Sequence, residues 1–145
     1  MTFWDSSALV PLMVQEPSTG VARGWLEADP DVVVWWGTGV ECASAIARLR
    51  REGVVDVRGE TDLLSLLDPL AGSWTEVLPS DALRASARRL LRVHPLRASD
   101  ALQLAAALTW AGTGEGHRLA TFDDRLALAA GLEGFVVVGG GGRLP

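Results

Sequence analysis

The stretch Leu96–Trp110, LRASDALQLAAALTW, decides how we expect the chain to fold. After Ser99 it is apolar on almost every side of a helix, and a helix with this pattern is buried inside a domain. Ser99 is a favourable N-cap residue, so the helix is expected to begin there. Asp100 then lies in the first turn of a buried helix. An acid at that position also has a purely structural interpretation, because it complements the helix dipole.

Short apolar segments alternate with helical segments on both sides of this central helix. The segment Val32–Trp36 is apolar without interruption, which indicates a strand covered on both faces, as in parallel sheets. The alternation of strands and helices favours α/β architecture with a parallel sheet. The expected strands are Thr2–Trp4, Val32–Trp36, Arg118–Thr121 and Phe135–Val138, with Val77–Pro79 as a short edge strand. We expect one domain over residues 1–138 and a flexible glycine-rich tail over residues 139–145.

The composition narrows the class of protein. Hydrophobic residues make up 48% and charged residues 21% of the chain, which is typical of a globular domain. The net charge of -5 argues against a protein that coats nucleic acid or binds an anionic membrane through a basic surface. Cys42 is the only cysteine, so no internal disulfide forms and a reducing compartment such as the cytoplasm fits. No apolar run approaches the roughly 18 residues that a membrane span needs.

Four acids occupy the same kind of place in the predicted fold. Asp5 follows the first strand, and Glu41 opens the helix after the second strand. Asp100 opens the central helix, and Asp123 follows the strand Arg118–Thr121. The junctions from strand to helix lie at the carboxyl edge of a parallel sheet, where ligands bind in open α/β folds. We therefore expect the four carboxylates to converge at this edge.

Each acid also has a local interpretation. Asp5 and Asp123 suit the N-cap position, and Thr38 with Glu41 has the T-x-x-E spacing of a capping box. Together, however, the four carboxylates would repel one another, and a divalent cation would relieve that repulsion. Ligation by oxygen alone suits Mg²⁺ or Mn²⁺, which activate water and hold a phosphate oxygen. Ser7 and Thr121 are candidates for orienting the carboxylates or water.

Other functional candidates are less specific. Arg84, Arg88 and Arg92 form one basic stripe on a predicted helix. The stripe is either a solvated face or a contact with a phosphate backbone or an acidic partner. The two histidines lack the spacing of zinc ligands. Cys42 has no obvious base beside it, so we expect a buried small residue rather than a nucleophile.

Four segments match one known family in the right order along nearly the whole chain. They are FWDSSALV (3–10), GVECASAIARLRREG (39–53), LRASDALQLAAAL (96–108) and LATFDDRLALAAGL (119–132). This set resembles PIN-domain ribonucleases, specifically the VapC-type toxins of bacterial type II toxin–antitoxin pairs. Asp5-Ser6-Ser7 looks like the D-[ST]-[SN] opening of that family, and Thr121-x-Asp123 is similar to its T-x-D segment.

The resemblance implies a three-layer α/β/α sandwich around a short, mainly parallel sheet. It implies a Mg²⁺- or Mn²⁺-dependent endoribonuclease site made by Asp5, Glu41, Asp100 and Asp123. The T-x-D register assigns the fourth acid to Asp123, with Asp124 as the neighbouring alternative. The resemblance also implies a homodimer that a cognate antitoxin protein holds inactive. On this basis we predict a cytoplasmic toxin that hydrolyses phosphodiester bonds in RNA.

Two alternative functions stay open. One is a PIN-like interaction module without catalysis, against which the four acids argue, because a binding module has no need to retain their repulsion. The other is a DNA-directed nuclease, which we consider less favoured because the chain carries no appended nucleic-acid-binding domain.

Overall fold

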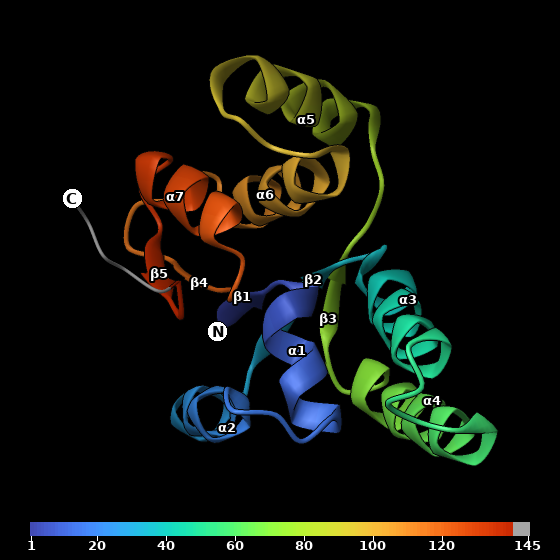
Figure 1. Cartoon of the computed structure of the whole chain (residues 1–145). Helices are drawn as coiled ribbons and strands as arrows, with labels where there is room; N and C mark the ends of the chain where they lie inside the picture. Colours follow the sequence, from blue (N-terminus) through green and yellow to red (C-terminus); the bar gives the residue numbers. More distant parts are fainter. Residues whose placement is uncertain (141–145) are drawn as a thin grey trace.

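The computed structural model describes residues 1–140, which form a sheet between two layers of helices (Figure 1). The strands are β1 (Thr2–Trp4), β2 (Val32–Trp35), β3 (Thr75–Val77), β4 (Arg118–Ala120) and β5 (Val136–Val138). The helices are α1 (Ser6–Met13), α2 (Thr19–Ala28), α3 (Thr38–Arg51), α4 (Val57–Ala71), α5 (Asp81–Val93), α6 (Ala98–Ala111) and α7 (Asp124–Leu132). This arrangement confirms the predicted α/β/α sandwich.

The sheet has the order β3-β2-β1-β4-β5, and every neighbouring pair is parallel. The strand β1 is central, so the residue that follows it, Asp5, lies in the middle of the carboxyl edge. The predicted edge strand is β3, which begins and ends two residues earlier than the sequence suggested. The predicted parallel sheet is therefore confirmed, with β3 and β5 at its two edges.

Helices cover both faces of the sheet, and each face has its own apolar core. On one face, Phe3 and Leu119 pack with residues of α5, α6 and α7, which lie above the sheet in Figure 1. On the other face, Trp4 and Val34 pack with residues of α1 to α4. Neighbouring strand residues point to opposite faces, so the middle of a strand between two helical layers is apolar on both faces. This explains the uninterrupted apolar character of β2.

The helix predicted at the centre of the chain is α6, and most of its middle is buried. It begins at Ala98 with Arg97 as the N-cap, so the predicted N-cap at Ser99 is wrong. The Asp100 carboxylate accepts a hydrogen bond of 3.1 Å from the backbone N–H of Arg97. An acceptor three residues after the N-cap thus satisfies a backbone donor at the helix start, and the exposed Ser99 is not needed there.

The segment after β5 packs on the domain at its first residue. Gly139 has a φ of 108°, and a Cβ added there would lie 2.4 Å from both the Trp25 ring and the Thr121 carbonyl oxygen. The close approach explains why glycine occupies this position. The rest of the predicted glycine-rich tail, from residue 141 onward, lies outside the described residues. Within residues 1–140, no helix has the length and apolar character to cross a bilayer.

Candidate metal centre at the carboxyl edge of the sheet

The four acids singled out in the sequence all lie where the chain enters a helix. Asp5 is the N-cap of α1 and Asp123 is the N-cap of α7. Glu41 lies in the first turn of α3, and Asp100 lies in the first turn of α6. Helix N-termini carry a partial positive charge, which favours carboxylates at each of these positions.

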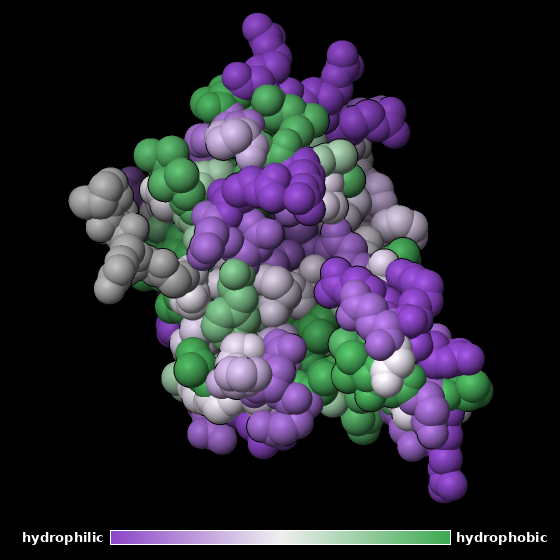
Figure 2. Space-filling view, in the orientation of Figure 1, coloured by the Kyte–Doolittle hydropathy of each residue, from purple (hydrophilic) through white to green (hydrophobic). Residues whose placement is uncertain are grey.

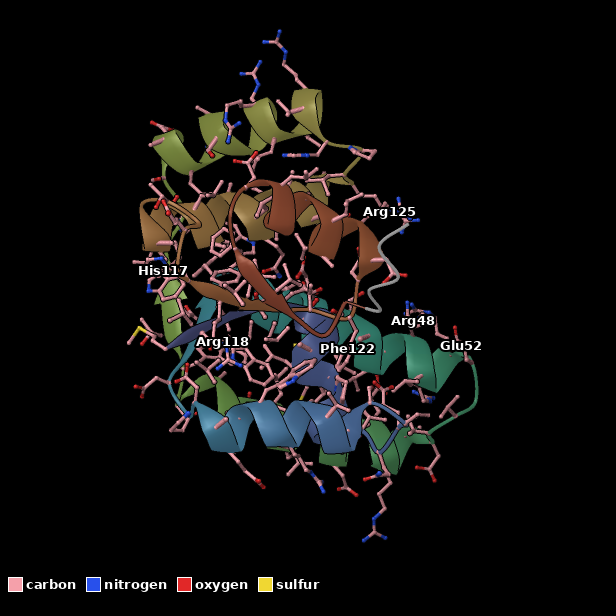
Figure 3. All side chains as sticks on the ribbon, turned by 90° about the vertical axis from the view of Figure 1, so that its left-hand side faces the viewer. Arg48, Glu52, His117, Arg118, Phe122 and Arg125 are labelled. Carbon is pink, nitrogen blue, oxygen red and sulfur yellow. The ribbon has the colours of Figure 1, made fainter. Side chains whose placement is uncertain are left out.

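Figure 3 shows on which side of the molecule the strands end, which is the carboxyl edge of the sheet. His117 and Arg118 mark the start of β4 on one side of the view, and Phe122 follows the end of the same strand. Arg125 of α7 and Arg48 of α3 lie toward the side to which β4 points. Two arginines therefore lie on the same side of the molecule as the carboxyl edge.

Asp5 is the most buried of the four acids, with 5% of its surface exposed. Its Oδ2 accepts hydrogen bonds from the Ser7 N–H at 3.2 Å, the Ser7 hydroxyl at 2.5 Å and the Thr121 hydroxyl at 3.0 Å. The same two hydroxyl oxygens accept bonds from the backbone N–H groups of Phe122 and Asp123, at 2.9 and 3.0 Å. Ser7 and Thr121 therefore tie Asp5 to the loop that carries Asp123.

Glu41 is held from the neighbouring helix α6. The Gln103 side-chain amide donates hydrogen bonds to a carboxylate oxygen of Glu41 and to the Thr38 hydroxyl, the latter at 3.1 Å. The N-cap of α3 is Gly37, with no side-chain cap. The capping box predicted for Thr38 and Glu41 is therefore wrong, because both side chains bond to Gln103 instead.

Gln103 is a residue of this site that the sequence analysis missed, as is Ser6, whose hydroxyl contacts Asp5 Oδ1 at 3.4 Å. The signal of Gln103 was a single polar side chain in the apolar middle of the central helix, three residues after Asp100. Residues three apart lie on the same side of a helix. The sequence alone does not indicate that this side chain contacts the start of α3.

Asp123 and its neighbour Asp124 differ in their surroundings. The Asp123 carboxylate accepts a hydrogen bond of 2.9 Å from the Leu126 N–H and is half-buried. Asp124 is exposed and forms the first residue of α7. Asp123, linked through its own N–H to Thr121, is thus the acid joined to the Asp5 network.

Burial raises the pKa of two of these acids, and repulsion by neighbouring acids adds to the rise at Glu41. For Asp5, the loss of solvent is the largest cause and outweighs the hydrogen bonds from Ser7 and Thr121. For Glu41, burial is again the largest cause, the bond from Gln103 lowers the pKa, and the charges of Asp5 and Asp100 raise it. Three of the four acids therefore interact electrostatically.

No protein cation offsets these acids within residues 1–140, because none of the four forms an ion pair there. In the same residues, no three Asp, Glu, His or Cys side chains stand close enough together to hold one ion. The four carboxylates of this structure are therefore not yet close enough to ligate one metal ion together. Their chemistry nevertheless fits a hard divalent cation, because the donors are carboxylate oxygens and their charge is uncompensated.

The surroundings of two other candidates, Cys42 and His94, indicate structural roles. Burial, together with the Glu41 and Asp5 charges, raises the pKa of the Cys42 thiol to about 12, which disfavours a nucleophilic thiolate. The buried His94 bonds through Nε2 to Glu133 at 2.7 Å, which links the ends of α5 and α7.

The arginine stripe lies on the outer side of α5. Leu83 and Leu90 of this helix are buried in the core shared with α6, whereas the stripe residues Arg84, Arg88 and Arg92 are exposed. Figure 2 shows hydrophilic side chains projecting from the region of α5 at the top of the molecule. The stripe is a solvated face in this structure, and its contact with RNA stays a prediction.

The family follows from the sequence together with this fold. Residues 2–132 match the family model of the PIN domain. The chain belongs to the PIN domain family. PIN domains are generally nucleases and typically use divalent metal ions, which agrees with the donor chemistry of the four acids. A search among curated proteins gives no match for this PIN domain.

Solved structures support the same fold. The PIN domain is similar to VapC20 of Mycobacterium tuberculosis, a sarcin-ricin loop cleaving toxin, with a TM-score of 0.67 and 20% identity over 97% of this chain and 100% of that chain. It is similar to FitAcB of Neisseria gonorrhoeae, with a TM-score of 0.68 and 19% identity over 94% of this chain and 96% of that chain. A toxin–antitoxin complex of Klebsiella pneumoniae has a TM-score of 0.62 and 16% identity over 86% of this chain and 88% of that chain. At these identities the comparisons show the fold alone.

Proposed function

We propose that this PIN domain is a Mg²⁺- or Mn²⁺-dependent endoribonuclease that acts as the toxin of a toxin–antitoxin pair. The observation that carries the proposal is the group of acids at the carboxyl edge, where the buried Asp5 and the half-buried Glu41 have no cation partner within residues 1–140. A protein that needed these acids only as helix caps would have no reason to bury one of them without a cationic partner.

In this proposal, carboxylate oxygens of Asp5, Glu41, Asp100 and Asp123 hold the cation. The bound cation supplies Lewis acidity toward a phosphate oxygen and lowers the pKa of water. The hydroxyls of Ser7 and Thr121, together with the Ser7 backbone N–H, donate three hydrogen bonds to one oxygen of the Asp5 carboxylate, Oδ2, and so fix its orientation. The other oxygen, Oδ1, has only a contact of 3.4 Å with the Ser6 hydroxyl and is the one available to a ligand.

RNA is the proposed substrate. The cleavage of the sarcin-ricin loop by the structurally similar VapC20 supports this choice over DNA. Arg48 and Arg125, which Figure 3 places toward the carboxyl edge, would contact the RNA backbone near the acids. The stripe of Arg84, Arg88 and Arg92 would extend that contact over α5.

We further propose a cognate antitoxin protein as the partner, a homodimer as the assembly and the cytoplasm as the location. Support for the antitoxin comes from the similar structures, because the Klebsiella pneumoniae structure is a toxin–antitoxin complex. The homodimer and the location rest on the family resemblance of the sequence.

Amide substitutions test the metal site, because Asn caps a helix about as well as Asp. Asp5→Asn, Glu41→Gln, Asp100→Asn and Asp123→Asn should each reduce the stabilisation of the protein by Mn²⁺ and lower RNA cleavage by orders of magnitude. Saturation with metal at 100 times Kd stabilises a protein by about 2.7 kcal/mol, which thermal unfolding with and without Mn²⁺ readily detects.

Asp124→Asn is the matched control, because it removes the same charge from the exposed neighbouring residue. It should retain the parental response to Mn²⁺ and the parental cleavage of an RNA panel. If all four amide variants behave like this control, the acids are helix caps and the proposed nuclease site is wrong.

A further inference from the structure

Gln103 occupies a position where a polar side chain is costly. It is 1% exposed and lies in α6 among the buried side chains of Leu104 and Ala106. Its Oε1 is buried with no hydrogen-bond partner among the described residues. An unpaired buried acceptor destabilises a fold, whereas an apolar side chain of the same length would fill this place without that cost. The stability of the helix therefore does not explain the glutamine.

The contacts of the amide explain it better. Both bonds of Nε2 go to the first turn of α3, one to a carboxylate oxygen of Glu41 and the other to the Thr38 hydroxyl. The opposite amide orientation would place Oε1 against the Glu41 carboxylate, with an acceptor facing an acceptor. The Glu41 charge thus fixes the orientation of the amide, and Oε1 is left unpaired as a consequence.

We propose that Gln103 is a positioning residue that holds Glu41 in one orientation for a divalent cation at the carboxyl edge. The inference rests on the proposed metal site. It adds that α6 supplies two groups to the site. One is the acid Asp100, and the other, three residues later, is the amide donor that fixes Glu41 in the first turn of α3. Because the Gln103 amide is an uncharged donor, Glu41 keeps its negative charge for a cation. An arginine at position 103 would neutralise that charge.

The test is the affinity of the purified chain for Mn²⁺ alone, measured by isothermal titration calorimetry. Gln103→Met keeps the length of the side chain and removes both donors, and Gln103→Leu is a second variant with the same loss. Each should weaken Mn²⁺ binding by about 10-fold or more, as the loss of groups that orient metal ligands typically does. Thr109→Val, six residues further along the same helix, is the control. It removes a side-chain hydrogen bond of 2.8 Å to the Ala105 carbonyl oxygen and should leave Mn²⁺ affinity close to the parental value.

A double-mutant cycle with Glu41→Gln separates positioning from a general structural role. If Gln103 acts through Glu41, the double variant Glu41→Gln/Gln103→Met binds Mn²⁺ no more weakly than Glu41→Gln alone. The proposal would be overturned if the losses of Mn²⁺ affinity from the two single substitutions multiply in the double variant. It would also be overturned if both Gln103 variants bind Mn²⁺ with parental affinity while Glu41→Gln binds it more weakly. Parental affinity of Glu41→Gln itself would instead overturn the metal site on which the inference rests.

Discussion

Two substitutions of Asp5 separate the charge of this side chain from its hydrogen bonds. Three of its four hydrogen bonds go to Oδ2, and Oδ1 has only the contact of 3.4 Å with Ser6. In Asp5→Asn, the amide oxygen can take the place of Oδ2 and accept all three bonds, while the amide nitrogen faces the Ser6 hydroxyl. Asp5→Asn therefore keeps the network and removes the charge.

Asp5→Ala removes both the charge and the hydrogen-bond network, and the structure sets the size of the stability difference between the two variants. The helix α1 loses its N-cap, which costs about 1 kcal/mol. The hydroxyls of Ser7 and Thr121 lie 3.1 Å apart, so one can donate to the other and one donor stays unsatisfied, at a cost of about 1–3 kcal/mol. Without metal, Asp5→Ala should be less stable than Asp5→Asn by about 2–4 kcal/mol, or roughly 5–15 °C in Tm.

The pH dependence distinguishes the parent from Asp5→Asn. Because burial raises the pKa of Asp5 in the folded state, folding favours the protonated form. The parent should therefore lose stability relative to Asp5→Asn as pH rises above the ordinary value of 3.8 and through the raised folded pKa. Thermal unfolding in EDTA between about pH 4 and pH 8 measures this difference. The reasoning fails if Asp5→Asn is as unstable as Asp5→Ala, or if it is less stable than the parent at the upper end of that range.

Three further predictions concern other parts of the molecule. Burial tends to raise the pKa of Glu133, but bonds from His94 and Arg89 outweigh it and hold that pKa below the ordinary value of 4.5. The stability that Glu133 contributes is present above pH 4.5 and is lost as pH falls through the folded pKa. Glu133→Gln should therefore flatten the acid side of a plot of stability against pH. An unchanged plot would contradict a stabilising role of the bonds from His94 and Arg89. Replacing Arg84, Arg88 and Arg92 together by Gln should reduce the salt slope of single-stranded RNA binding by up to about 2, and an unchanged slope would leave the stripe a solvated face. Co-expression with the product of the neighbouring reading frame should give co-elution in size-exclusion chromatography, and separate elution would count against an antitoxin encoded there.

Features that depend on local sequence were predictable from the residues alone. The apolar pattern of Leu96–Trp110 indicated a buried helix, and the uninterrupted apolar segment at Val32 indicated a strand covered on both faces. Acids placed directly after strands indicated a shared edge, because parallel strands all end on the same side of a sheet. These predictions rest on the periods of the helix and the strand, which a sequence displays directly.

Features that depend on contacts between distant residues were decided by the tertiary structure. Thr38 and Glu41 have the spacing of a capping box, yet both side chains accept hydrogen bonds from the amide of Gln103, which lies 62 residues from Glu41 in sequence. Likewise, Thr121 reaches Asp5 across 116 residues and ties two helix starts together. A hydrogen-bonding side chain near a helix start can bond locally or to another element, and only packing determines which partner is nearer. For that reason the sequence indicated the acids, and the fold determined the groups that hold them.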